Sequence, residues 1–262
     1  MIYFLSDAHL GSRAIEKGWK HQKKVVEMLE EMSKDAVSIY LLGDMFDFWM
    51  EYYRRDRSKR RFEPFLHELK SLVRRGIHVH FFIGNHDLWT FGGLEQMAGC
   101  EIHYHPATIS RYGKTLYLCH GDGVMPSNWT SLYPKPVVRK IKRFMFLRSI
   151  FQSRFLQACF RSLPPSWGNR FGYEWAKKSR LKELANPCPY KGEDKEELVL
   201  FAKEQEQLGN HHDYYIFGHR HIELDLQINA FSRVVILGDC FQQFTYARLD
   251  HKGQLTLHNY EQ

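Results

Sequence analysis

Five short apolar runs in this sequence end in residues of the kinds that bind metal ions, and this recurrence restricts the possible folds strongly. The residues that follow the runs are Ser-Asp-Ala-His, Gly-Asp, Gly-Asn-His-Asp, His-Gly-Asp and Gly-His-Arg-His. In an open α/β sheet, ligands bind beyond the carboxyl ends of the strands. The sequence therefore predicts that the strand ends bring one set of polar side chains to a single crevice: Asp7, His9, Asp44, Asn85, His120, His219 and His221.

The order of predicted strands and helices indicates an α/β fold. Amphipathic segments at residues 21–34, 62–76 and 197–209 predict helices between several of the strands, with Gly76 as a helix stop. Residues 242–260 predict two further strands around a turn, and hence a second, partly antiparallel sheet. Short apolar runs predict the main strands at Ile2–Leu5, Ser38–Leu42, His78–Ile83, Thr115–Cys119, Tyr214–Phe217 and Arg233–Leu237.

One segment differs from the rest in composition. Residues 127–186 are rich in basic and aromatic residues and are interrupted by Pro164-Pro165. This composition predicts a helical insertion at 127–186 within a core formed by residues 1–126 and 187–262. The alternative is a helical hairpin whose apolar face packs on the core and whose basic face is solvated.

The charge and cysteine content favour anionic partners and a reducing compartment. The chain has 37 basic and 30 acidic residues, a net charge of +7 and a pI near 9.1. Such a charge suits phosphates, nucleic acid or an acidic membrane surface. The five scattered cysteines contain no Cys-x-x-Cys pair, and the apolar run at residues 2–5 is too short for a signal peptide. No apolar stretch is long enough to span a bilayer, so a cytoplasmic location is expected.

The predicted ligand set suits two divalent metal ions. Imidazoles and carboxylates favour manganese, iron, zinc or cobalt over magnesium or calcium. A carboxylate such as Asp44 can bridge two ions, and a pair of ions can activate water for in-line displacement at phosphorus. Taken separately, each motif is also compatible with a turn or a surface histidine, and only their joint occurrence indicates a metal centre.

Three further aspartates have alternative interpretations. Asp47 and Asp122 either orient histidine ligands or serve in a helix cap or turn. Gly238-Asp239 follows another apolar run and is interpreted as a turn between the last strands.

The motif order resembles that of the calcineurin-like metallophosphoesterases. It runs Asp7-x-His9, Gly43-Asp44-x-x-Asp47, Gly84-Asn85-His86-Asp87, His120-Gly121-Asp122 and Gly218-His219-x-His221. The resemblance implies a four-layer αββα sandwich. It also implies that His86 lies near the scissile phosphate as electrophile or general acid, with Asp87 orienting it. The implied ligands are Asp7, His9, Asp44 and His221 for one metal and Asp44, Asn85, His120 and His219 for the other.

A narrower resemblance is to the UDP-2,3-diacylglucosamine hydrolases of lipid A biosynthesis. It depends on the motifs SDAHL and GDMFDFW and on the insertion after Asp122. It implies cleavage of the substrate's pyrophosphate to UMP and diacylglucosamine 1-phosphate, with manganese favoured and the insertion acting as a lid over the acyl chains. The family usually has arginine where this chain has His86, which instead follows the general phosphoesterase pattern. The candidate substrate contacts in the insertion are Arg139, Lys142, Arg143, Ser179 and Lys182.

Several other functions stay open on the sequence alone. The same core could act on another phosphodiester, a nucleotide or a nucleic acid. The basic residues of the insertion alternate with aliphatic ones such as Leu147 and Ile150, which suits acyl chains better than a nucleic-acid backbone. A basic aromatic helix also suits the anionic surface of the inner membrane. An inactive scaffold of the same fold would be expected to lack ligands, whereas this chain has them all.

Overall fold

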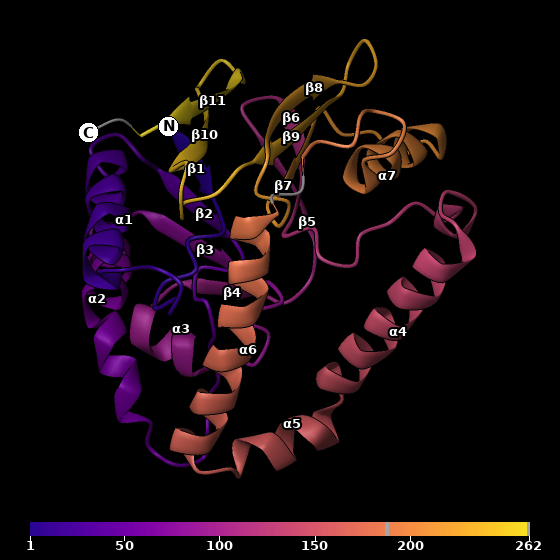
Figure 1. Ribbon diagram of the computed structural model, residues 1–262. Coiled ribbons are helices and arrows are strands. Elements are labelled where there is room, and N and C mark those ends of the chain that lie inside the picture. The colour runs from indigo at the N-terminus through magenta and orange to yellow at the C-terminus, as the bar shows by residue number, and fades with distance from the viewer. Residues whose placement is uncertain (187–188, 261–262) are drawn as a thin grey trace.

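Two β-sheets stack face to face, and helices cover the outer face of each (Figure 1). The computed structural model describes residues 1–186 and 189–260. The first sheet has six strands in the order β11-β10-β1-β2-β3-β4. Strands β1 to β4 run parallel, so their carboxyl ends meet at one edge. The strands of this sheet are β1 (Ile2–Leu5), β2 (Ser38–Leu42), β3 (His78–Phe82), β4 (Glu101–His103), β10 (Thr245–Leu249) and β11 (Leu255–Asn259).

The second sheet has five strands in the order β5-β6-β7-β9-β8. Its central strands β6, β7 and β9 are parallel, and each coincides with a predicted apolar run. The sequence did not predict β4, β5 or β8, because these short edge strands carry few buried apolar residues. The strands are β5 (Ala107–Arg111), β6 (Lys114–Cys119), β7 (Tyr214–Phe217), β8 (Glu223–Gln227) and β9 (Arg233–Leu237).

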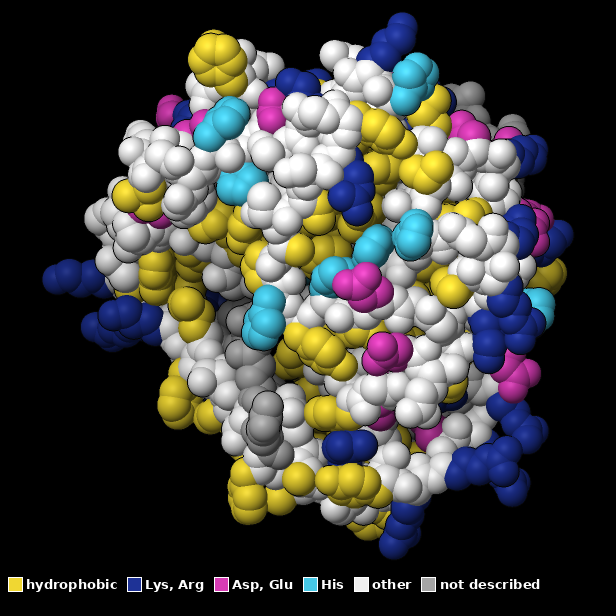
Figure 2. Space-filling model, turned by 180° about the vertical axis from the view of Figure 1, so that it is seen from behind, with side chains coloured by type: hydrophobic (Ala, Val, Ile, Leu, Met, Phe, Trp, Pro, Cys, Tyr) yellow, Lys and Arg dark blue, Asp and Glu magenta, His cyan; other side chains and the backbone are white. Residues whose placement is uncertain are grey.

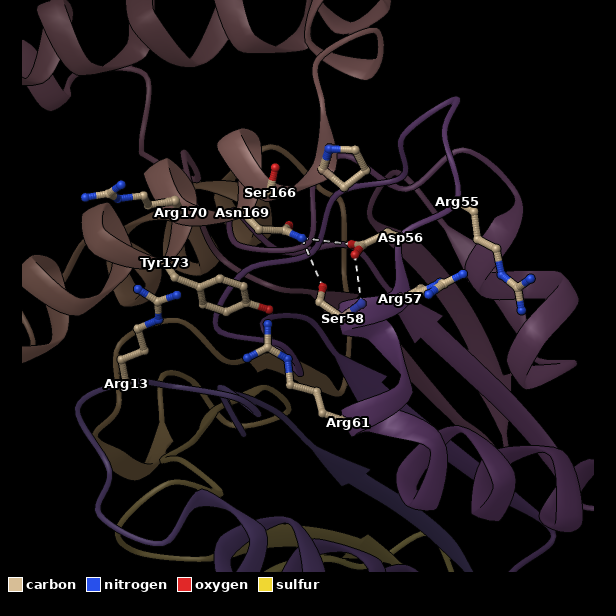
Figure 3. Close-up of a pocket in the computed structure, with 11 residues that line it drawn as sticks. Arg13, Arg55, Asp56, Arg57, Ser58, Arg61, Ser166, Asn169, Arg170 and Tyr173 are labelled. Carbon is tan, nitrogen blue, oxygen red and sulfur yellow. Dashed lines mark hydrogen bonds between the residues drawn. The ribbon is translucent and has the colours of Figure 1, made fainter.

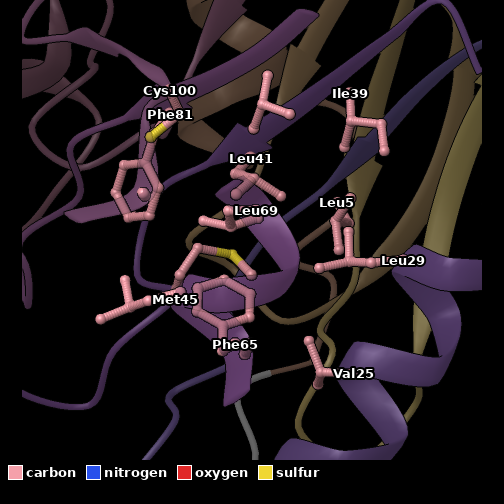
Figure 4. Close-up of a cluster of buried hydrophobic side chains, with 14 of the residues drawn as sticks. Leu5, Val25, Leu29, Ile39, Leu41, Met45, Phe65, Leu69, Phe81 and Cys100 are labelled. Atoms are coloured by element: carbon pink, nitrogen blue, oxygen red, sulfur yellow. The ribbon is translucent and has the colours of Figure 1, made fainter. Parts of the chain in front are cut away.

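Three apolar interfaces hold the layers together. The first lies between the six-stranded sheet and helices α1 (Gly18–Met32), α2 (Glu63–Arg74) and α3 (Gly93–Ala98), as the side chains of Figure 4 show. The second lies between the two sheets and includes Phe4 and Ile216. The third packs α7 (Glu197–Gln207) on the five-stranded sheet. The four-layer αββα sandwich is therefore confirmed.

The predicted helices are also present. Helices α1, α2 and α7 fall within or next to the expected segments. Helix α2 ends at Arg74, and Gly76 has a φ of 86°, which a residue with a side chain rarely adopts.

The basic aromatic segment forms helices that leave the sandwich and return to it. They are α4 (Lys135–Gln152), α5 (Arg154–Arg161) and α6 (Pro165–Ala185), preceded in the segment by a short 3₁₀ turn, η2 (Trp129–Ser131). A further 3₁₀ helix, η1 (Arg57–Phe62), comes directly before α2. In Figure 1, α6 runs back along the sheets, whereas α4 stands apart from them. Residues 187–188, at the expected start of the second core segment, lie outside the described residues. Within the described ranges, no helix has the length and apolar character needed to cross a membrane.

Candidate metal centre

The structure brings six of the seven predicted ligands into two groups whose donor atoms lie close together. One group is Asp7, His9 and His221, and the other is Asp44, His120 and His219. In each group the donor atoms lie within 4.8 Å of one another. We refer to these six residues and Asn85 as the metal centre.

The backbone at the metal centre is strained. Five of its residues have positive φ angles, between 45° and 68°, although none is glycine. Such conformations cost energy and are typical of sites where geometry serves a function. The strained residues are Asp7, His9, Asp44, His219 and His221.

Glycines at the strand ends let the ligand loops approach one another. A Cβ on Gly218 would lie 2.6 Å from an Asp7 carboxylate oxygen, and one on Gly43 would lie 2.6 Å from His120 Nδ1. A Cβ on Gly84 would lie 2.2 Å from Asp44 Oδ1 and 2.6 Å from the Asp44 backbone nitrogen. The glycines predicted beside the ligands are therefore required by the packing of the site.

We expect Gly84→Ala to weaken metal binding by roughly 10-fold or more, the range found when ligand-orienting contacts are lost. The new methyl group would displace Asp44, whose backbone cannot easily move away. Metal content per chain and metal affinity, measured by elemental analysis and titration, test this. Gly18→Ala is a matched control because nothing lies within 4 Å of its added Cβ. Unchanged metal affinity in Gly84→Ala would contradict this account of the loop packing.

One donor atom at the centre, Asn85 Oδ1, is buried and has no hydrogen-bond partner among the described residues. Leaving a buried polar atom unpaired costs about 1–3 kcal/mol. His120 Nδ1 lies 2.8 Å from the carbonyl oxygen of Leu42, which leaves Nε2, 3.3 Å from Asp44 Oδ2, as the metal-binding nitrogen. Asn85 and His120 belong to the ligand set predicted for the second metal, so the residues fit that group.

The electrostatics of the site also favour cations. Burial opposes charge on Asp7 and Asp44, but nearby histidines, chiefly His221 and His120, hold the pKa of both carboxyls well below the usual range. Burial likewise opposes charge on His221, yet Asp7 and Glu183 raise its pKa to about 10. Two buried carboxylates thus need compensating positive charge, which divalent ions would supply while binding neutral imidazoles.

The two histidines of the second group, His120 and His219, have pKa values shifted in opposite directions. Burial opposes charge on His120, but Asp44 raises its pKa well above the ordinary value. Burial, together with His120, lowers the pKa of His219 to about 4, so this imidazole is neutral at pH 7. A neutral imidazole is the form that binds metal ions.

His86 lies at the centre, and a carbonyl oxygen holds its ring. Its backbone N–H donates to Asp44 Oδ1 at 2.8 Å, and its Nδ1 lies 2.6 Å from the backbone oxygen of Asp47. We expected Asp87 to orient this ring, but the Asp87 carboxylate instead accepts the backbone N–H groups of Gly84 and Met45. Asp87 therefore braces the two ligand loops, and burial, reinforced by Asp44, raises its pKa to about 8.

The structure distinguishes the three further aspartates. Asp47 is buried, and its carboxylate lies 3.7 Å from His9 Nδ1. Asp122 acts electrostatically on both His120 and His219 and favours the charged form of each ring, although burial lowers the pKa of His219 overall. Asp47 and Asp122 therefore both lie close enough to candidate ligand histidines to influence them electrostatically. Asp239 accepts the backbone N–H groups of residues 241–243, which confirms the turn.

Helix α6 contributes two residues that the sequence analysis missed. Arg180 is only 3% exposed, and its Nη2 lies 2.9 Å from His9 Nδ1. Glu183 Oε1 lies 2.6 Å from His221 Nδ1. Both continue the inward face of α6 that begins with Tyr173 and Ala176, at helical spacings of three and four residues. This periodicity was the available signal, but the charge of the segment suggested a solvated face.

The predicted substrate contacts of the insertion do not reach the metal centre. Arg139, Lys142 and Arg143 are exposed on α4, which stands apart from the sheets (Figure 1). Ser179 and Lys182 are exposed on α6 beside the buried Arg180 and the partly buried Glu183. Substrate binding by these five residues stays a prediction.

An apolar cavity of about 470 Å³ opens beside His86. The floor of the cavity comes from the loops after β2 and β3, and its cover comes from α5, α6 and their connection. Tyr173 fastens this cover, because its hydroxyl donates to the Phe48 carbonyl oxygen at 3.0 Å. The apolar lining of the cavity includes Phe48, Trp49, Met50, Leu88, Trp89, Phe160, Leu163, Phe171 and Trp175.

A second cavity, of about 920 Å³, is lined by arginines between η1 and α6. Arg13 and Arg61 point toward the ring of Tyr173, whereas the arginines at the rim point away from it (Figure 3). The guanidinium carbon of Arg61 lies 4.3 Å from the centroid of that ring. The rim arginines are Arg55, Arg57 and Arg170.

Comparisons with known proteins find similar sequences and structures. A family model described as calcineurin-like phosphoesterase matches residues 1–223. A Porphyromonas gingivalis protein named UDP-2,3-diacylglucosamine hydrolase is 34% identical over 95% of this chain and 94% of its own length. A Neisseria gonorrhoeae protein of the same name is 26% identical over 96% of this chain and 95% of its own length. Among solved structures, a dimetal phosphatase from Danio rerio aligns over 98% of this chain and 95% of its own, with a TM-score of 0.48 and 12% identity.

Proposed function

This chain belongs to the calcineurin-like phosphoesterase family and is a metal-dependent hydrolase, and we propose that its substrate is UDP-2,3-diacylglucosamine. Hydrolysis of the pyrophosphate would release UMP and diacylglucosamine 1-phosphate. The names of the two relatives and the apolar cavity at the metal centre support this substrate.

The metal centre would hold two divalent ions, with manganese favoured over iron, zinc or cobalt. When bound, such ions supply Lewis-acid activation of water and stabilise charge on the phosphate oxygens. Asp7, His9 and His221 would hold one ion, and Asn85, His120 and His219 the other. Asp44 would be shared by both ions, because its donor atoms lie within 4.8 Å of those of His120 and His219 and also of that of His9.

The apolar cavity beside His86 is the observation that carries the substrate assignment. An acyl chain in this cavity would gain about 0.8 kcal/mol for each methylene removed from water. The lining contains no lysine or arginine that would follow a nucleic-acid backbone, and a small phosphate monoester would leave most of the cavity unfilled. The sugar-linked phosphate would then lie at the cavity mouth, between His86 and the metal centre.

Arg180 suits the anionic part of the same substrate. Its guanidinium is buried between His9, Asp47 and Glu183, and Arg recognises phosphate oxygens with two parallel hydrogen bonds. Because α6 also covers the apolar cavity, one helix would contact both the acyl chains and the pyrophosphate.

Metal-dependent release of UMP tests the assignment. Purified protein supplied with Mn²⁺ should release UMP from UDP-2,3-diacylglucosamine and lose this activity after chelation. A UDP-sugar without acyl chains is the control, and its turnover should be far slower. Hydrolysis of a generic phosphodiester without UMP release would keep the phosphoesterase and reject this substrate.

We expect His86→Ala to retain its metals and to slow hydrolysis most for substrates with poor leaving groups. A general acid contributes about 10²–10⁴-fold, and a leaving group of low pKa needs little protonation. Rates for a series of phosphodiesters of graded leaving-group pKa measure this. Equal slowing across the series would exclude proton donation by His86.

We further propose that the arginine-lined cavity faces the anionic surface of the inner membrane, from the cytoplasmic side. One rim arginine, Arg170, lies beside two exposed aromatic residues of α6, Trp167 and Phe171, which are 73% and 71% exposed. Basic residues beside exposed aromatic rings are typical of surfaces that bind anionic lipids.

Charge reversal of Arg55, Arg57 and Arg170 to glutamate should weaken binding to phosphatidylglycerol vesicles by about 100-fold or more, since each basic residue near the surface contributes about 1 kcal/mol. Vesicle co-sedimentation measures this. The matched control reverses Lys20, Lys23 and Arg74, exposed residues of α1 and α2, and should bind as the wild type does. Equal losses in both variants would mean that only net charge matters.

A further inference from the structure

A further group of potential metal ligands lies outside the metal centre and is distinct from the two groups there. His80, Glu101 and His103 place one donor atom each within 4.8 Å of the others. His80 belongs to β3, and the other two belong to the neighbouring edge strand β4. Seen from behind, the molecule carries several histidine side chains near the middle of that face, with acidic side chains beside them, while many lysine and arginine side chains lie toward the rim (Figure 2).

The register of the two strands creates this group. His80 pairs directly with Glu101, and Phe82 pairs with His103. Since alternate residues of a strand share one face, all four side chains lie on the same side of the sheet. That side faces the second sheet, because Phe82 belongs to the apolar cluster between the sheets.

We propose that His80, Glu101 and His103 form a third metal site, structural in role and suited to Zn²⁺. The His80 Nδ1 lies 3.1 Å from His103 Nε2 and 3.2 Å from Glu101 Oε2. The His103 Nε2 lies 3.4 Å from Glu101 Oε1. Ligands bound tetrahedrally to zinc at about 2.0–2.1 Å lie about 3.3–3.5 Å from one another. The two ring nitrogens approach different oxygens of Glu101, and each of the three spacings is close to the edge of a zinc tetrahedron.

The three side chains already contact one another without an ion. Each of the two facing ring nitrogens has the other ring and one carboxylate oxygen of Glu101 as neighbours, so an N–H on either nitrogen has an acceptor. A cation held by the two rings and the carboxylate would use the same lone pairs and replace these hydrogen bonds.

Both imidazoles are in the state and orientation that metal binding needs. Burial lowers the pKa of His80 and of His103, so both are neutral at pH 7. The His80 ring stacks on Tyr40 with centroids 4.4 Å apart, and the His103 ring stacks on Phe82 at the same distance. The stacking fixes the rings before any ion binds, which lowers the entropic cost of binding.

The surroundings indicate zinc and a structural role. Arg111 of β5 acts electrostatically on His80 and opposes a cation, so affinity must come from the imidazoles, which favour zinc over magnesium or calcium. Glu101 is 64% exposed, which leaves a fourth position open to water. The ion would fasten β4, an edge strand of three residues, to β3 just before the chain crosses to β5 in the other sheet. This site is independent of the proposed substrate.

Zinc stoichiometry tests the proposal in the full-length protein. The wild type should bind three Zn²⁺ per chain and His103→Gln two, with hydrolytic activity in Mn²⁺ unchanged. His78→Gln is the matched control, since His78 is exposed on the same strand, and it should bind three. In the wild type, Zn²⁺ should also raise the melting temperature beyond the rise given by Mn²⁺, and this extra rise should vanish in His103→Gln.

Two results would overturn the third site. One is a wild type that binds no more than two Zn²⁺ per chain, and the other is His103→Gln binding as many as the wild type. If His103→Gln does not fold, Glu101→Gln replaces it, because this exposed side chain keeps its shape and loses only its charge. It should weaken the third zinc by at least 10-fold, and unchanged affinity counts against the proposal.

Discussion

Replacement of Asp44 by alanine should abolish metal-dependent hydrolysis, with a loss of about 10³-fold or more in kcat. Asp44 is 2% exposed, and its donor atoms group both with His120 and His219 and with His9. Removing a shared ligand would disrupt both ions of the proposed dinuclear centre, each of which would contribute several kcal/mol to stabilising the transition state. UMP release in Mn²⁺ and metal content per chain measure the effect.

Asp250→Ala serves as the control for Asp44→Ala. Asp250 accepts backbone N–H groups in the turn between β10 and β11, far along the chain from any ligand. This variant should keep two metals and nearly full activity. Near-normal turnover of Asp44→Ala, with the fold intact by circular dichroism, would contradict the dinuclear centre.

Substitution of Leu163 by glutamate should remove the preference for long acyl chains. Leu163 lines the apolar cavity between α5 and α6, and a carboxylate there would draw water into the lining. For the wild type, four methylenes fewer should lower kcat/KM on the order of 10²-fold, at about 0.8 kcal/mol each. In Leu163→Glu, substrates with long and short chains should react at nearly equal rates.

Leu163→Met is the matched control, because it keeps the apolar lining and nearly the same volume. It should retain the chain-length preference. Metal content of both variants shows whether the centre is intact. If Leu163→Glu keeps the wild-type preference while it folds and binds metal, the acyl chains occupy another surface.

Much of the fold could be predicted because its signals are local. The six expected strands and the helices α1, α2 and α7 all appear, since each is an apolar run or an apolar helix face of ordinary length. Strands β4, β5 and β8 were missed because they are edge strands with few buried side chains. Their formation depends on neighbours that lie elsewhere in the sequence.

Some residues of the candidate site could likewise be predicted from local sequence, and others could not. The ligands were predictable because each follows a strand, and parallel strands bring their ends to one edge of a sheet. The group that orients His86 could not be predicted. The Asp87 carboxylate and the Asp47 carbonyl oxygen are both candidates, and only the loop geometry decides which of them contacts the ring. The role of Arg180 was also missed, since a basic helix gives no sign of which charged side chain turns inward.

The sequence by itself determined the main strands and helices of this protein and the candidate ligands at its strand ends, because hydrophobic periodicity and strand-end position are encoded within a few residues. The four-layer sandwich was implied by the family resemblance, and the two strands at 242–260, expected in a second sheet, instead extend the first sheet as β10 and β11. Only the tertiary structure decided that α6 places Arg180 against His9, that α5 and α6 cover an apolar cavity beside His86, and that β3 and β4 bring His80 and His103 together. These contacts join segments that lie more than 20 residues apart in the chain. Their geometry follows from strand register and from packing between layers, which no local pattern of residues specifies.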